Sequence, residues 1–84
     1  MEQNQEFQQA IHAVEEADDA VGHLQANVTP RGMQRAQLQL QLAQEALHQA
    51  QSHDMDEEQE KRLKRAKEHL RHLQEAQQAI QQYD

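Results

Sequence analysis

Apolar residues recur at spacings of three and four along three long stretches of this 84-residue chain. The first series is Phe7, Ala10, Ile11, Val14, Ala17, Val21, Leu24 and Val28. The second is Met33, Ala36, Leu40, Ala43, Leu47 and Ala50, and the third is Leu63, Ala66, Leu70, Leu73, Ala76, Ile80 and Tyr83. At about 100° per residue, each series lies on one stripe of an α-helix. The pattern predicts amphipathic helices over about residues 3–26, 30–51 and 55–82.

Two short polar segments separate the predicted helices. Thr29 before Pro30 is typical of an N-cap followed by proline at the first helical position. In the second segment, Asp54 with Glu57 fits a capping box, in which the aspartate accepts from a backbone amide and the glutamate reaches back. We therefore expect the second helix to begin near Pro30 and the third near residue 55.

The chain is long enough for a single domain, residues 1–84, with a thin core. Ala, Gln, Glu, Leu, Lys and Arg dominate it, and all of them favour helices. Three amphipathic helices with short connections predict an all-α fold, an antiparallel three-helix bundle. The alternative is a long helical hairpin that dimerises to complete its core.

Leu38 and Leu42 break the polar pattern of the second predicted helix. They lie about 160° from Leu40 and stack one turn apart, so they form a single apolar ridge on the back of that helix. One interpretation is a homodimer seam or a partner-binding ridge. The other is partial burial of both leucines by the chain ends or by a rotated helix.

The first predicted helix has acidic residues but no Lys or Arg to balance them. The chain has a net charge of -7, and residues 1–28 carry no Lys or Arg. Glu15, Glu16, Asp18 and Asp19 form a candidate acidic face. One interpretation is that this face confers solubility and pairs with basic side chains of the third helix, if the two helices are neighbours. The other is that the face binds a basic partner.

The third predicted helix carries a basic cluster: Lys61, Arg62, Lys64, Arg65, Lys67 and Arg71. Alone, such a cluster suggests nucleic acid. In its context it predicts a solvated helix with pairs four residues apart, namely Glu57–Lys61, Glu58–Arg62, Glu60–Lys64 and Arg71–Glu75. The absence of nearby aromatic rings and the acidic net charge both argue against nucleic-acid binding.

Six histidines raise the question of a metal. Glu45 and His48 have the Glu-x-x-His spacing of di-metal sites in helix bundles, but we expect them on the outer side, because Ala43 and Leu47 occupy the seam. His69 and His72 are three residues apart, and we expect them at most to share a surface ion weakly. We predict solvated histidines, with no metal and no cofactor.

Catalytic signals are close to absent. The chain has no Cys and no Gly-rich phosphate loop, and no strand–turn–helix that would hold a nucleophile. A small three-helix bundle also rarely encloses a ligand pocket. We predict that the protein is not an enzyme and has no small-molecule substrate.

The first six residues lack the basic and apolar regions of a secretory signal, and no apolar run exceeds two residues. The expectation is a soluble, cytoplasmic protein without membrane contact. The order Ala17-Asp18-Asp19-Ala20-Val21-Gly22, then the Pro-started helix from Met33 to Ala50, then the acidic restart at Asp54–Glu58 leading to Leu70–Leu73, resembles small all-helical proteins of Bacillus-type bacteria. The resemblance implies a cytoplasmic bacterial protein and assigns no site residues.

These features together predict a non-enzymatic helical module for protein–protein interaction or regulation, acting on itself as a homodimer or on a protein partner. A second hypothesis is an acidic-face regulator of a basic partner. A third is a weak metal or nucleic-acid binder that uses the surface histidines or the Lys61–Arg71 cluster.

Overall fold

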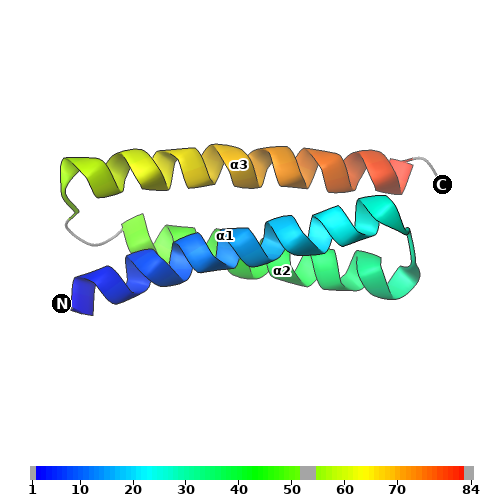
Figure 1. The fold of residues 1–84 in the computed structure, drawn as a ribbon, viewed down its shortest axis with the longest axis horizontal. Helices are drawn as coiled ribbons and strands as arrows, with labels where there is room; N and C mark the ends of the chain where they lie inside the picture. The colour runs from blue at the N-terminus through cyan, green and yellow to red at the C-terminus, as the bar shows by residue number, and fades with distance from the viewer. Residues whose placement is uncertain (1, 52–54, 83–84) are drawn as a thin grey trace.

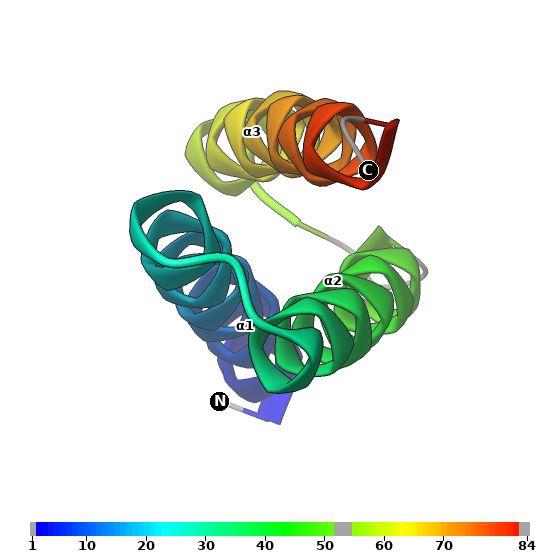
Figure 2. The ribbon, with the colours of Figure 1, turned by 90° about the vertical axis from the view of Figure 1, so that its right-hand side faces the viewer.

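The computed structural model describes residues 2–51 and 55–82, and within them three helices. These are α1 (Glu2–Ala26), α2 (Pro30–Gln51) and α3 (Glu57–Gln82). Helices α1 and α3 run in one direction and α2 runs in the opposite direction (Figure 1). Viewed end on, the three helices stand at the corners of a triangle (Figure 2). The prediction of an antiparallel three-helix bundle is confirmed, and because all three helices of one chain contact one another, the core is completed without a second copy.

The core is a narrow column of small and medium apolar side chains, in a molecule of 44 × 18 × 17 Å. Its buried members come from every helix: Phe7, Ala10, Val14, Ala17, Ala20, Val21, Leu24, Ala36, Leu40, Ala43, Leu47, Ala50, Leu63, Ala66, Leu70 and Leu73. Helices α1 and α2 make the most extensive contact, and α3 packs more lightly on both. The many buried alanines explain the difference, because a methyl side chain lets two backbones approach closely.

The predicted stripes hold for α2 and need correction in the other two helices. Val28 is 52% exposed, because α1 ends at Ala26 and the chain turns before that residue. In α3, Gln77 is buried, whereas the predicted stripe residues Ala76 and Ile80 are only half-buried. The alternating three–four spacing from Leu63 through Leu73 leads to position 77, so helix geometry outweighs polarity there. Tyr83 lies outside the described residues.

Thr29 caps α2 as predicted. The Gly32 backbone N–H donates to Thr29 Oγ1 at 2.9 Å, and the Met33 N–H donates to the Thr29 carbonyl at 2.9 Å. A Cβ on Gly32 would lie 3.0 Å from Thr29 Oγ1 and 3.3 Å from Leu24 Cδ1. Glycine therefore leaves room for both the cap and the packing of α1 against the start of α2.

The cap of α3 is Asp56, which corrects the predicted capping box. The Gln59 N–H donates to Asp56 Oδ1 at 2.8 Å, and the Asp56 N–H donates to Gln59 Oε1 at 3.3 Å. Helix α3 thus begins at Glu57, two residues later than expected. Asp54 and Asp56 are each followed three residues later by a Glu or a Gln, so the sequence offered two equivalent boxes. Asp54 itself lies outside the described residues.

Truncating two leucines that lie two positions apart on α2 should change the free energy of unfolding by very different amounts. Leu40→Ala removes a side chain that is 4% exposed and should lower the free energy of unfolding by about 2–5 kcal/mol. Leu38→Ala, at a position that is 54% exposed, should change it by less than about 0.5 kcal/mol. Urea unfolding followed by circular dichroism at low protein concentration measures both. Equal losses would contradict the placement of α2.

Candidate interaction surface

The leucine ridge, Leu38 and Leu42, is an exposed apolar feature on the outer side of α2. The two side chains are 54% and 46% exposed, whereas Leu40 between them is 4% exposed. Their positions follow from helix geometry, since residues two apart are rotated by about 200°. In the described part of the chain α2 is not rotated to bury either leucine, and the chain ends invoked by the other interpretation lie outside the described residues.

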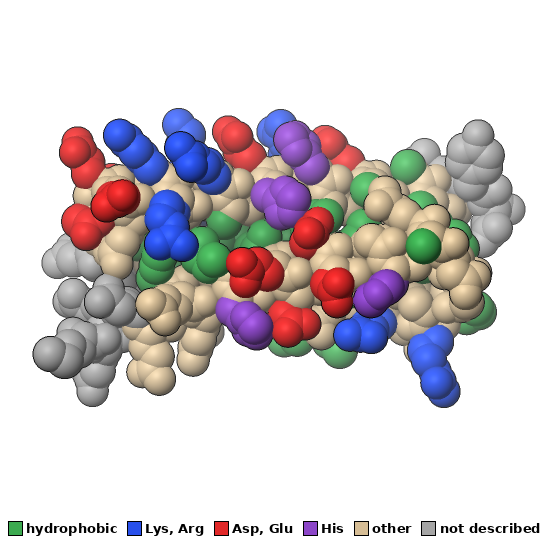
Figure 3. All heavy atoms as spheres, viewed as in Figure 1, with side chains coloured by type: hydrophobic (Ala, Val, Ile, Leu, Met, Phe, Trp, Pro, Cys, Tyr) green, Lys and Arg blue, Asp and Glu red, His purple; other side chains and the backbone are tan. Residues whose placement is uncertain are grey.

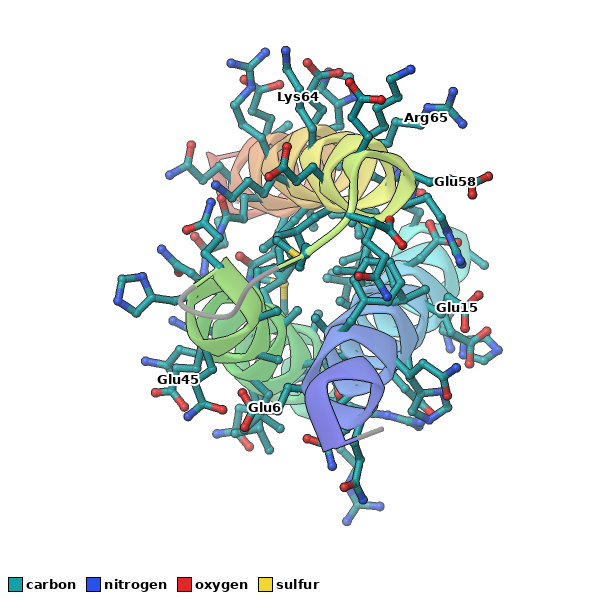
Figure 4. All side chains as sticks on the ribbon, turned by 90° about the vertical axis from the view of Figure 1, so that its left-hand side faces the viewer. Glu6, Glu15, Glu45, Glu58, Lys64 and Arg65 are labelled. Atoms are coloured by element: carbon teal, nitrogen blue, oxygen red, sulfur yellow. The ribbon has the colours of Figure 1, made fainter. Side chains whose placement is uncertain are left out.

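Polar side chains surround the ridge. Gln41 and Glu45 are exposed beside it, and Glu45 points away from the bundle in Figure 4. A shallow hollow of about 500 Å³ lies next to the ridge along α2, lined by Gln41, Gln44, Glu45, His48 and Gln49. The surface thus combines a small apolar centre with a polar rim, which is the usual anatomy of a protein–protein contact.

The acidic face lies on α1, and each of its four carboxylates approaches a histidine. His12 Nε2 is 3.3 Å from Glu16 Oε1, and His12 Nδ1 is 4.0 Å from Glu15 Oε1. His23 Nδ1 is 4.0 Å from Asp19 Oδ2. These side chains are largely exposed, so each contact contributes little to stability and becomes an ion pair when its histidine is protonated.

Side-chain contacts outside the centre of the core also join α1 to α3 in the described region. His69 Nε2 lies 3.2 Å from Asp18 Oδ1. Near the other end of the pair, the Arg62 guanidinium lies over the Phe7 ring, 5.2 Å from its centroid. Helices α1 and α3 are therefore neighbours, as the pairing interpretation of the acidic face required. The partner of Asp18, however, is a histidine and not one of the lysines or arginines of α3.

The basic cluster is exposed along the first half of α3. Figure 3 shows Lys and Arg side chains gathered over this part of α3, with Asp and Glu side chains grouped over the middle of the molecule. Lys64 and Arg65 point away from the bundle (Figure 4). None of the four predicted pairs between these basic residues and glutamates closes within 4.0 Å in the described region. That prediction is wrong, since long solvated side chains gain little from pairing.

The candidate metal ligands do not converge. Glu45 and His48 are both exposed on the outer side of α2, where the sequence placed them. Among the residues that the structure describes, no group of three or more His, Asp or Glu side chains is arranged to hold a metal ion. His69 is already close to Asp18.

Gln77 is a buried polar side chain that sequence reasoning missed. It is 7% exposed, and its Nε2 has no hydrogen-bond partner among the described residues. A strict count of three–four spacing along α3 would have found it, because positions 70, 73 and 77 continue the series. Gln77 does not line the hollow beside the ridge on α2.

The chain matches no protein-family model, no curated protein and no solved structure. Its function must therefore be argued from its own surface. Across the described residues, no helix combines the length and apolarity needed to cross a membrane.

Replacing Gln77 should stabilise the bundle. Gln77→Leu removes a buried amide that lacks a partner and adds apolar contact, so we expect the free energy of unfolding to rise by about 1 kcal/mol. Gln78→Leu, at the exposed neighbouring position, is the matched control and should leave it nearly unchanged. The midpoint of urea unfolding measures both. A destabilised Gln77→Leu protein would show that the amide is satisfied in solution.

Proposed function

We propose that the protein is a non-enzymatic interaction module that binds a protein surface through the outer side of α2. The exposed leucine ridge is the observation that carries this proposal. The core already uses the opposite side of α2, where Ala36, Leu40 and Leu47 are buried. Neither leucine belongs to the core of the described residues, and both keep about half of their surface in water.

The energetic scale fits a modest contact. Fully burying one leucine contributes about 1.5–3 kcal/mol, so covering the remaining half of two such side chains contributes a similar total. Polar neighbours such as Gln41 and Glu45 add directional contacts at the rim. This sum suits a reversible association, and the affinity depends on what the partner adds.

A second candidate uses the acidic face to bind a basic protein surface. The supporting observation is that the described partners of Glu15, Glu16, Asp18 and Asp19 are histidines, with no lysine or arginine within 4.0 Å in the described region. A basic partner would supply the charge that α3 does not bring to this face. We rank this candidate second, because exposed carboxylates also serve solubility alone.

The first candidate is tested by making the ridge charged. Leu38→Glu with Leu42→Glu should abolish association, because burying two carboxylates in a contact is unfavourable. Light scattering measures self-association, and capture from a lysate of the native cell measures association with other proteins. Gln37→Glu with Gln51→Glu adds the same charge at exposed positions of α2 that lie outside the ridge and its hollow, and should retain binding.

Two results would contradict the first candidate. One is the absence of any association, with self or with another protein, that depends on Leu38 and Leu42. The other is an equal loss of binding in the control variant. Circular dichroism of each variant establishes that the helices are intact.

The second candidate predicts binding that weakens with salt. A lysine-rich peptide should bind the wild-type chain at low ionic strength and dissociate as the screening length falls from about 10 Å at 0.1 M salt to about 3 Å at 1 M. Asp18→Asn with Asp19→Asn should weaken it by several fold, as measured by fluorescence anisotropy of a labelled peptide. Glu57→Gln with Glu58→Gln removes equal charge from α3, and an equal loss there would show attraction to net charge alone.

A further inference from the structure

The outer side of α2 carries a second three–four series, separate from the one that packs in the core. Its members are Arg31, Arg35, Leu38, Leu42, Glu45 and Gln49, and all six are exposed. On a helix with about 100° per residue, they lie within about 40° of the direction opposite Leu40. Spacings of four, three, four, three and four are those of a coiled-coil seam.

This series is symmetric about Leu40. Position 38 mirrors position 42, position 35 mirrors position 45, and position 31 mirrors position 49. The two central mirror positions are both leucine. The next two, Arg35 and Glu45, carry opposite charges. A helix that packs antiparallel against its own copy, with a twofold axis through position 40, brings each residue opposite its mirror position.

We infer that a second copy of this chain covers the ridge, with the two α2 helices antiparallel and centred on Leu40. The inference rests on the proposed function and names its partner. In this arrangement Leu38 of each chain packs on Leu42 of the other, so four leucines form the centre of the contact. The two arginines at position 35 lie opposite the two glutamates at position 45.

Charge selects this direction over the parallel one. A parallel pair in register would place Arg31 and Arg35 against the same arginines of the second copy, and Glu45 against its own copy. Like charges in contact are unfavourable, whereas the antiparallel pair forms two Arg35–Glu45 contacts. Within one chain Arg35 and Glu45 cannot contact each other, because they are ten residues apart on one helix, a distance of about 15 Å. Neither has an ion pair within 4.0 Å in the described region.

The size of the contact indicates a weak dimer. From Arg31 to Gln49 the seam is about 27 Å long, and it involves one helix from each chain. Such a strip is smaller than the roughly 800 Å² per partner of a standard stable interface. Association should therefore be measured over a wide range, from about 10 μM to about 1 mM.

Charge reversal tests the pairing. Arg35→Glu places the new carboxylate against Glu45 of the second copy, and Glu45→Arg places the new guanidinium against Arg35 of the second copy. Each single variant should therefore raise the dissociation constant of the dimer by tenfold or more. The double variant in one chain should recover the wild-type constant. An equimolar mixture of the two single variants should form a heterodimer, although neither self-associates. Sedimentation equilibrium measures all four samples.

The direction is tested by a distance. The chain has no cysteine, so Gln49→Cys accepts a single spin label. In the antiparallel dimer the two labelled backbones should be about 27 Å apart, whereas a parallel dimer would bring them within about 10 Å. Dipolar electron spin resonance separates the two outcomes.

Each result separates this inference from the proposed function. A wild-type chain that stays monomeric up to about 1 mM overturns the inference. So does a dimer that ignores both single charge reversals, or one with a short spin-label distance. The proposed function still holds in those cases if another protein binds in a manner that requires Leu38 and Leu42, and it fails if nothing does.

Discussion

Close packing of α1 against α2 is the contact on which the rest of the molecule depends. Alanines such as Ala10, Ala17, Ala36 and Ala43 are fully buried and let the two backbones approach, while leucines and valines between them fill the remaining volume. Thr29 and Gly32 hold the short turn that sets the relative position of the two helices. Helix α3 then lies along the hairpin and completes the core with Leu63, Leu70 and Leu73. The result is a rod with little interior, so the surface is where its chemistry must occur.

That surface is divided by helix. Helix α1 carries the acidic face and no Lys or Arg, the basic cluster lies on α3, and the leucine ridge lies on α2. Between α1 and α3, the Asp18–His69 contact is about half exposed, and Arg62 lies over the buried Phe7 ring at the edge of the core. They leave the outer side of α2 untouched. The bundle can therefore fold with one side of α2 and bind with the other, and the two tasks do not compete for the same side chains.

The fold was predictable from sequence because its signal is periodic and repeated three times. The seam of α2 and the Thr29 cap were located to the residue, since a strict three–four spacing and a proline start allow few alternatives. The start of α3 was not, because Asp54 and Asp56 are each followed three residues later by a Glu or a Gln, and only the structure shows that Asp56 is the cap. Gln77 was missed because polarity was given more weight than spacing. The exposure of Leu38 and Leu42 also had to come from the structure, since a small rotation of α2 would have hidden one of them.

Burial of alanine has a consequence for how this chain can change over evolutionary time. At Ala10, Ala17, Ala36 and Ala43 a larger side chain would force the helices apart, while the glutamine-rich exterior tolerates almost any polar replacement. Selection on the fold therefore conserves the buried alanines, which are common residues in any helical protein, and allows the exposed positions to change. Two homologous chains that keep the same helical bundle would then share little sequence identity beyond widely spaced alanines and leucines.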